Sequence, residues 1–254
     1  MEYKALILNP TDFNPNMKIC FIFAMRAEAQ PLIDHYGLEE QQGFFSPLPC
    51  KLYKTPSNSP LKGEGFFVVL NGVCHNRDLI GCEAAAVTTQ AAILRLQPDL
   101  VVSCGTCGGW QRYGARVGQA YVADGVMFHD RRVPGDNEWD TQGLGNYKVW
   151  EGSWQLAQRL GLPMGKVTTG SSFDLSPEED ALIDAKGGRL KEMEGAAVAF
   201  VCSLYGVPVA LVKAVTNLRD AADQGDDIDA FHANLRRATL ALSEACSGLV
   251  ALLA

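Results

Sequence analysis

The chain has 254 residues, of which 47% are hydrophobic and 20% are charged, a composition typical of a globular protein rather than of a disordered or fibrous one. Its 22 lysines and arginines against 29 aspartates and glutamates give a formal net charge of −7, which argues against a nucleic acid or an acidic membrane surface as its partner. The longest apolar run, residues 196–202, is far shorter than the roughly 18 residues that a membrane span needs.

The amino-terminal segment is predicted to be a loose arm over residues 1–16, followed by one domain over residues 17–254. Its short apolar stretch is broken by Pro10 and Pro15, so it lacks the pattern of a signal peptide, and a cytoplasmic location is expected. The eight cysteines are therefore expected to be reduced and mostly buried rather than paired in disulfides.

Strand-like and helix-like patterns alternate along the first half of the chain. A buried strand over 18–24 leads into a helix over 26–36, which Gly37 closes. An Ala-rich helix is predicted over 79–96, and further strands over 52–55, 66–70, 99–104 and 121–128. Residues 130–151, which include Pro134 and three glycines, are predicted to form a long loop.

The second half repeats this alternation. Ser176 as N-cap, Pro177 at the first helical position and Glu179 form a capping box that fixes one helix start. The other predicted helices cover 153–160, end at Tyr205 and begin at about Asp229, and the strands cover 166–169, 190–194 and 209–215. The pattern predicts an α/β fold: a single three-layer α/β/α domain with a central, largely parallel mixed sheet.

Ligands of such a sheet bind at the carboxyl ends of its strands. The glycine-rich segment GTCGG at 105–109 follows a predicted strand, where its backbone can approach a ligand or form an ordinary strand-to-helix turn. It lacks the spacing of a dinucleotide site and the lysine of a P-loop. Cys104 and Cys107 form a CxxC pair with no second ligand pair, so small buried packing residues are favoured over a metal site, and no metal is expected.

Carboxylates and a histidine follow other strands. Glu192 and Glu194 would share one side of an extended segment, with Met193 on the other, where they suit a sugar diol or form a solvated pair at a helix start. Taken by itself, Glu28 is predicted to be an ordinary surface charge on a helix. His129 is a candidate general base, although a simpler interpretation is that it forms a hydrogen bond to Asp130.

Several segments in this order resemble one enzyme family. They are AMRAEAQPL at 24–32, PDLVVSCGTCGG at 98–109, VMFHDRRVP at 126–134, TTGSSFDLS at 168–176, KEMEGAAVAF at 191–200 and KAVTNLRD at 213–220. The chain from residue 17 onward resembles the 5′-methylthioadenosine/S-adenosylhomocysteine nucleosidases, most of all their plant-type branch, within the nucleoside phosphorylase and hydrolase superfamily. The resemblance implies a nucleoside phosphorylase-like fold and no cofactor.

The resemblance also implies a reaction and residue roles. Water would cleave the bond between adenine and the thioribose through an oxocarbenium-like sugar, with Glu28 activating the water. Glu194 would bind the ribose hydroxyls and Met193 would pack on the sugar. Phe173 would stack on adenine, the backbone of Asp174 would read its Watson–Crick edge and Glu192 would lie near the base. The other expected substrate contacts are Met25, Thr106, Cys107, Gly108, Ile228 and Phe231.

The sequence departs from the family at Asn217, where an aspartate normally protonates N7 of adenine. An amide supplies no proton, and loss of a general acid commonly costs roughly 10² to 10⁴ in rate. Ser171 likewise stands where an aspartate is usual. A disabled variant, a natural enzyme with weak or altered chemistry, and a purine-binding relative without activity all remain open. Asp220 is judged too far along the chain to replace the acid.

Two other functions compete with hydrolysis. A purine nucleoside phosphorylase would need an arginine-lined phosphate site, for which Arg26 and Arg77 are candidates, although Glu28 would repel phosphate there. A non-catalytic nucleoside-binding or storage protein is the second alternative. By resemblance a homodimer is expected, with the loop from Phe128 to Pro134 closing the partner subunit's pocket.

Overall fold

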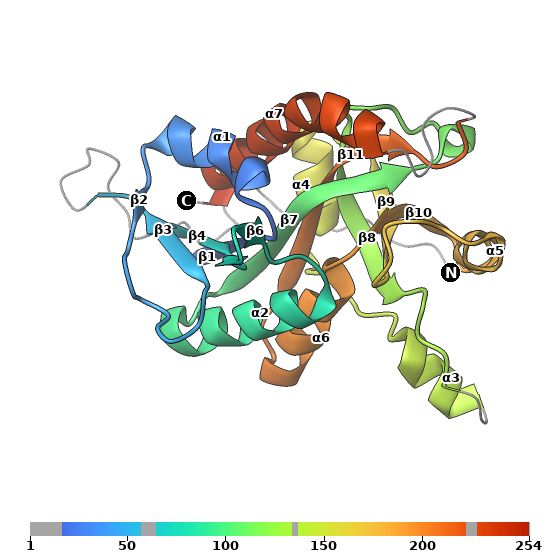
Figure 1. Ribbon diagram of the computed structural model, residues 1–254, viewed down its shortest axis with the longest axis horizontal. Helices are drawn as coiled ribbons and strands as arrows, with labels where there is room; N and C mark the ends of the chain where they lie inside the picture. The colour runs from blue at the N-terminus through green and yellow to red at the C-terminus, as the bar shows by residue number, and fades with distance from the viewer. Residues whose placement is uncertain (1–16, 57–64, 134–136, 222–227, 254) are drawn as a thin grey trace.

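A computed structural model of the chain describes residues 17–56, 65–133, 137–221 and 228–253. The arm predicted over residues 1–16 lies outside the described residues, as does Pro134. Within the described parts, a large mixed sheet is covered by helices on both faces (Figure 1), which confirms the predicted α/β fold class.

The central sheet has nine strands in the order β10-β9-β8-β11-β7-β1-β4-β3-β2. The strands are β1 (Ile19–Phe23), β2 (Glu39–Glu40), β3 (Lys51–Lys54), β4 (Phe66–Leu70), β7 (Leu100–Gly109), β8 (Ala120–Phe128), β9 (Met164–Thr169), β10 (Gly188–Glu192) and β11 (Val209–Leu218). β1 pairs in parallel with β4 and β7, and β7 pairs in parallel with β11. β11 and β8 run antiparallel, as do β2, β3 and β4.

β10 pairs with β7 as well as with β9. Leu190 and Lys191 lie opposite Gly109 and Gly108 in this antiparallel pairing, so β7, β11, β8, β9 and β10 close into a ring. A separate hairpin of β5 (Val73–Cys74) and β6 (Arg77–Asp78) stands outside the sheet. The ring brings the last residues of β7, β10 and β11 to one end of the molecule.

The helices form two layers. They are α1 (Arg26–Tyr36), α2 (Cys82–Leu96), α3 (Asn137–Leu144), α4 (Ser153–Leu160), α5 (Pro177–Ala185), α6 (Gly195–Tyr205) and α7 (Ile228–Leu253). Buried side chains of α1, α4 and α7 share one hydrophobic core with the sheet, and those of α2 and α6 share a second core on its other face (Figure 1). This arrangement confirms the three predicted layers.

Local sequence signals account for several element boundaries. α1 has the predicted bounds, and Gly37 ends it with φ 59°, a left-handed conformation that glycine adopts without strain. At α5, Ser176 accepts a hydrogen bond from the Glu179 backbone N–H, and the Glu179 carboxylate accepts one from the Ser176 backbone N–H. The predicted capping box is therefore confirmed.

Three predictions of local structure were wrong. Residues 105–109 form the second half of β7 rather than a turn, because Gly108 and Gly109 pair with both β10 and β11. β11 likewise runs on to Leu218, so Asn217 lies within the strand. The segment 130–151 contains α3 and is not a continuous loop.

The prediction that the cysteines are reduced and mostly buried agrees with the structure. All eight cysteines are free thiols, and Cys74 alone among them is exposed. In the parts of the chain that the structure describes, no helix is long and apolar enough to cross a bilayer, and no group of histidine, cysteine and carboxylate side chains is arranged to hold a metal ion.

Candidate functional site

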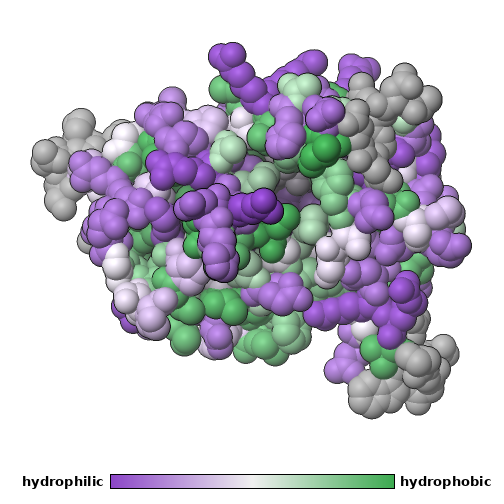
Figure 2. All heavy atoms as spheres, in the orientation of Figure 1, coloured by the Kyte–Doolittle hydropathy of each residue, from purple (hydrophilic) through white to green (hydrophobic). Residues whose placement is uncertain are grey.

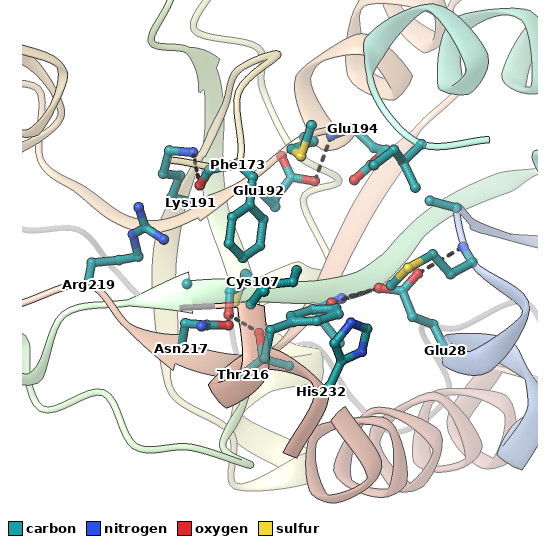
Figure 3. A pocket seen from close by; sticks show the side chains of 18 residues that line it. Glu28, Cys107, Phe173, Lys191, Glu192, Glu194, Thr216, Asn217, Arg219 and His232 are labelled. Carbon is teal, nitrogen blue, oxygen red and sulfur yellow. Dashed lines mark hydrogen bonds between the residues drawn. The ribbon is translucent and has the colours of Figure 1, made fainter. Parts of the chain in front are cut away.

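A pocket of about 280 Å³ opens at the end of the ring where β1, β7, β10 and β11 finish. Its floor comes from the ends of these strands, and its mouth from the start of α7 and the segment that follows β9 (Figure 3). Its lining residues are Ala24, Met25, Glu28, Ile80, Thr106, Cys107, Gly108, Phe173, Lys191, Glu192, Met193, Glu194, Thr216, Asn217, Arg219, Ile228, Phe231 and His232.

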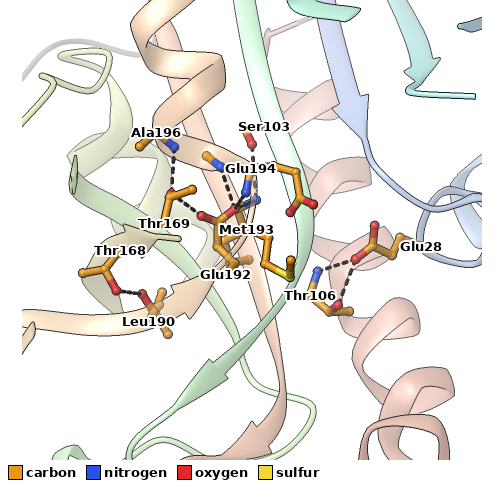
Figure 4. Close-up of polar contacts among 12 residues, drawn as sticks. Glu28, Ser103, Thr106, Thr168, Thr169, Leu190, Glu192, Met193, Glu194 and Ala196 are labelled. Carbon is orange, nitrogen blue, oxygen red and sulfur yellow. Dashed lines mark hydrogen bonds and ion pairs between the residues drawn. The ribbon is translucent and has the colours of Figure 1, made fainter. Parts of the chain in front are cut away.

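Glu28 is a buried carboxylate that accepts three hydrogen bonds, of which Figure 4 shows the two from Thr106. Its Oε1 accepts the backbone N–H of Thr106 at 2.7 Å and the Thr106 hydroxyl at 2.9 Å. Its Oε2 accepts the backbone N–H of Met25 at 3.1 Å, because Glu28 occupies the third position of α1 and Met25 is the N-cap. Burial raises the pKa of Glu28, although these hydrogen bonds oppose the rise. Such a carboxylate is suited to accept a proton.

Glu192 is buried and makes an ion pair and hydrogen bonds inside the fold. Its Oε2 lies 2.8 Å from the Lys213 ammonium, with both side chains 1% exposed, and it accepts the backbone N–H of Gly195 at 2.7 Å. The Thr169 hydroxyl donates to Oε1 (Figure 4). Burial acts to raise the pKa of Glu192, but the Lys213 charge and these donors outweigh it, so the pKa lies below its usual value.

Glu194 has the opposite environment. Its Oε1 accepts the backbone N–H of Gly81, the N-cap of α2, at 2.7 Å, and Glu194 is itself the N-cap of α6. Burial, together with the negative charge of Glu192, raises the pKa of Glu194 to about 7. Met193 lines the same pocket as both carboxylates, so the predicted strand alternation was wrong; β10 ends at Glu192 and the chain turns into α6.

A β-bulge sets the position of Asn217. Val215 lies opposite Cys107 and Asn217 opposite Gly108, which leaves Thr216 as the extra residue of β11. The Thr216 hydroxyl donates to the Cys107 carbonyl at 3.2 Å, and the Asn234 amide donates to the Thr216 carbonyl at 2.9 Å. Asn217 is 2% exposed and lines the pocket.

Side chains from β10 and from the end of β8 hold the segment that carries Phe173. Lys191, which is 4% exposed, donates to the carbonyls of Ser172 at 2.6 Å and Phe173 at 3.1 Å. The Asp130 carboxylate accepts the backbone N–H of Ser171 at 2.6 Å. The Phe173 ring meets the Phe231 ring edge to face, with 5.9 Å between centroids. A planar base could stack in the pocket on a ring held in this way.

The His129 ring packs closely against Gly170, at the start of the same segment. A Cβ on Gly170 would lie 2.3 Å from Nε2 of His129, so only glycine allows this close approach. The predicted hydrogen bond from His129 to Asp130 was wrong, since Nδ1 of His129 is buried without a hydrogen-bond partner among the described residues. Burial and the charge of Lys191 lower the pKa of His129 to about 4, and His129 does not line the pocket.

The pocket brings together nearly all the predicted site residues. Glu28, Asn217, Met25, Thr106, Cys107, Gly108, Phe173, Glu192, Met193, Glu194, Ile228 and Phe231 all line it. Asp174 does not. Phe128 is 1% exposed in the core of its own chain, against Tyr147 and beneath the Arg131 guanidinium. Phe128 is the last residue of β8. Because its side chain is buried within its own chain, it cannot contact a partner subunit.

Several lining residues were missed by the sequence argument. They are Ala24, Ile80, Lys191, Thr216, Arg219 and His232. One had a usable signal, because Lys191 directly precedes the predicted Glu192–Glu194 cluster. Arg219 had none, because the strand before it was predicted to end at residue 215.

Arg26, Arg77 and Asp220, which were considered for phosphate binding or for the acid, lie outside the pocket. Arg26 donates to Gln30 and to the Tyr53 hydroxyl, away from the pocket, and Arg77 is exposed on the β5–β6 hairpin. Asp220 accepts the backbone N–H groups of Gln111 and Arg112. None of the three lines the pocket, which agrees with the expectation that Asp220 does not reach the position of the acid.

Known proteins resemble this chain over most of its length. A sequence profile described as the phosphorylase superfamily matches residues 18–251. An Arabidopsis thaliana 5′-methylthioadenosine nucleosidase is 38% identical over 216 residues, which cover 81% of this chain and 76% of that protein. An Arabidopsis thaliana 5′-methylthioadenosine/S-adenosylhomocysteine nucleosidase is 34% identical over 250 residues, covering 96% and 94%. The apo structure of an Arabidopsis thaliana 5′-methylthioadenosine nucleosidase superposes with a TM-score of 0.86 at 34% identity, covering 94% of this chain and 97% of that one.

Proposed function

Because this chain belongs to the phosphorylase superfamily and, within it, to the 5′-methylthioadenosine/S-adenosylhomocysteine nucleosidases, we propose that it hydrolyses the N-glycosidic bond of 5′-methylthioadenosine. The products would be adenine and a 5′-thioribose, and S-adenosylhomocysteine is the second candidate substrate. The observation that carries the proposal is the Glu28 carboxylate, fixed by Met25 and Thr106 at the pocket wall.

Glu28 would act as the general base. The reaction breaks the bond between C1′ of the sugar and N9 of the base, and positive charge develops on the sugar as the base departs. A water molecule beside Glu28 would give its proton to the carboxylate while its oxygen bonds to C1′. The hydrogen bonds from Thr106 and Met25 keep the carboxylate in place, which favours this geometry without reorganisation during the reaction.

Other pocket contacts would hold the nucleoside. The Glu194 carboxylate would accept hydrogen bonds from the ribose hydroxyls, with Met193 against the sugar and Phe173 stacked on the base. The raised pKa of Glu194, about 7, means that these hydroxyls bind best above neutral pH, where the carboxylate is charged. Ile228, Phe231 and Met25 line the same pocket and would contact the 5′-alkylthio group.

Asn217 would limit the rate of this reaction. Its amide can hydrogen-bond to N7 of adenine but cannot protonate it, so we propose that the enzyme is weakened in the step in which the base departs. Of the two proposed catalytic residues, Glu28 is the same as in the family and Asn217 differs, so only the stabilisation of the leaving group would change.

Two observations favour water over phosphate as the nucleophile. Arg26 and Arg77, the candidate phosphate ligands, do not line the pocket, and Glu28 would place its negative charge beside the anion. The test is release of adenine from 5′-methylthioadenosine with and without phosphate. Release in water supports hydrolysis, release that requires phosphate indicates a phosphorylase, and tight binding without turnover indicates a nucleoside-binding protein.

We also propose that the protein is a homodimer, formed through α2 and α6. The exposed side chains Val87, Phe200, Leu204 and Tyr205 lie on these two helices, and α6 contains no charged residue. Figure 2 shows hydrophobic residues gathered at the lower edge of the molecule, where Figure 1 places α2 and α6. A symmetric interface brings each surface against its own copy, so a chain with net charge −7 requires an uncharged patch there.

A further inference from the structure

Apart from Glu192, which is paired with Lys213, the acidic and basic side chains that line the pocket lie on different sides of it. Figure 3 shows Glu28 and Glu194 on one side of the pocket, and Lys191, Asn217 and Arg219 on the other. Heterolysis of an N-glycosidic bond separates charge in the same sense, leaving the sugar positive and the departing purine negative. A site with fixed charges of matching sign stabilises that transition state more than the ground state.

Arg219 is the cation placed beside Asn217. The two residues are separated by Leu218, and the backbone N–H of Arg219 donates to the Gly109 carbonyl at 2.8 Å, so the pairing with β7 continues past the end of β11. Arg219 begins the turn that follows β11. Both Asn217 and Arg219 line the pocket.

The neighbouring strand is shaped to admit the Arg219 side chain. A Cβ on Gly108 would lie 2.4 Å from Cδ of Arg219 and 3.0 Å from Cγ, so any residue other than glycine would displace it. The aliphatic part of Arg219 thus crosses β7 directly over Gly108. The Lys191 ammonium donates to the Ser172 and Phe173 carbonyls.

We propose that Arg219 is a catalytic residue of this chain, whose guanidinium stabilises the negative charge of the departing purine in place of the proton that Asn217 cannot supply. This inference rests on the proposed hydrolysis. A guanidinium keeps its proton, so Arg219 acts by charge and hydrogen bonding rather than as an acid.

The step balances without a protein acid. The electron pair of the C1′–N9 bond passes to the purine, which leaves as an anion held by Arg219 and by the Asn217 amide. The water oxygen bonds to C1′, and its proton passes to Glu28. The purine anion then takes a proton from solvent, and Glu28 releases its own. Removal of one such preorganised donor typically lowers kcat by about 10²- to 10³-fold.

A double-mutant cycle tests this role. Single-turnover adenine release from 5′-methylthioadenosine is measured for the wild type, Arg219→Ala, Asn217→Asp and the double variant. We expect Arg219→Ala to lower the rate about 100-fold, and to lower it less than about 10-fold when an aspartate at position 217 supplies the proton. The control Arg116→Ala removes an arginine that is exposed and outside the pocket and should leave the rate unchanged.

A second measurement separates catalysis from structure. The Arg219→Ala loss should shrink for 5′-methylthio nucleosides whose purine carries an electron-withdrawing group, because such a base leaves readily as an anion. Arg219→Lys, which keeps the charge, should recover part of the rate, and thermal unfolding checks that each variant is folded.

Three outcomes would overturn the role of Arg219: unchanged turnover by Arg219→Ala, an equal loss for every base, or an equal loss with and without the Asn217→Asp substitution. These outcomes leave the proposed hydrolysis standing. If neither the wild type nor Asn217→Asp releases adenine, the hydrolysis itself is contradicted and the inference falls with it.

Discussion

Thr106 donates twice to Glu28, through its backbone N–H at 2.7 Å and its hydroxyl at 2.9 Å, both to the same carboxylate oxygen. The pair joins the second half of β7 to the first turn of α1. Hydrogen bonds to a carboxylate stabilise its charged form, so Thr106 opposes the rise in pKa that burial imposes on Glu28.

Thr106→Val should therefore shift the acidic limb of the kcat–pH profile to higher pH, because it removes the hydroxyl donor and raises the pKa of Glu28 further. Glu28→Gln should abolish the base, with a fall in kcat of about 10²- to 10⁴-fold and little change in nucleoside affinity. Steady-state kinetics from about pH 5 to 9, on either side of neutrality, and calorimetric titration measure the two effects. Glu83→Gln, at an exposed position in the first turn of α2, is the matched control. An unshifted profile in Thr106→Val would mean that the limb belongs to another group.

Asn217→Asp should raise kcat by about 10²- to 10⁴-fold, because it supplies an acid at the base side of the pocket. The gain should appear in kcat rather than in KM, since the amide and the carboxyl group have similar shape. Adenine release at saturating 5′-methylthioadenosine measures it. No gain would point to the nucleoside-binding alternative.

Glu194 makes the unfolding free energy depend on pH. Its folded-state pKa, about 7, lies above the usual value of 4.5, so the folded protein binds this proton more tightly than the unfolded chain does. The stability associated with Glu194 is present below pH 4.5 and is lost as the pH rises through 7. Glu194→Gln still accepts the Gly81 N–H, and its Tm should exceed that of the wild type more at about pH 8 than at about pH 5. A constant difference in Tm across this range would show that the Glu194 pKa is not raised.

Lys191→Met should raise KM more than it lowers kcat, because Lys191 holds the Ser172 and Phe173 carbonyls rather than the reacting atoms. The variant should also lose about 1.5–3 kcal/mol of stability, the net contribution of hydrogen bonds made by a charged donor. Kinetics and chemical denaturation measure the two effects. Lys166→Met, whose ammonium binds the Lys186 carbonyl away from the pocket, is the control. A fall in kcat alone would place Lys191 in the chemical step instead.

Leu204→Glu should dissociate the proposed dimer, because a symmetric interface would bury the new carboxylate against its own copy. Leu204 is 66% exposed on α6. Trp154→Glu changes a side chain that is 53% exposed on α4 and is expected to leave the assembly intact. Sedimentation velocity distinguishes the two variants. A monomeric wild type would contradict the proposal directly.

Much of the fold follows from short-range signals in the sequence. The bounds of α1 were predictable because Gly37 ends it, and the start of α5 because Ser176 and Glu179 cap each other. The length of β7 was not predictable from its own residues. Gly108 and Gly109 look like a turn, and only their pairing with β10 and β11 keeps them extended.

The pocket lining was predictable where the family resemblance identifies a single residue, as for Glu28 and Glu194. It was not predictable where a role depends on a distant neighbour. The place of Arg219 depends on Gly108, which lies far away in sequence. The burial of Phe128 depends on Tyr147, which packs against it from a segment predicted to be a loop.

The single extra residue at Thr216 fixes which side chains of the last strand belong to the cavity and which to the interior. We therefore expect substitutions at 217 and 219 to change how a departing base is stabilised while the path of the strand stays the same. A regular pairing that kept Thr216 but lacked this bulge would set Thr216 opposite Gly108 and Asn217 opposite Gly109, which would turn Asn217 to the other face of the strand. The irregularity of one strand thus decides which face of its last residues is turned to the cavity.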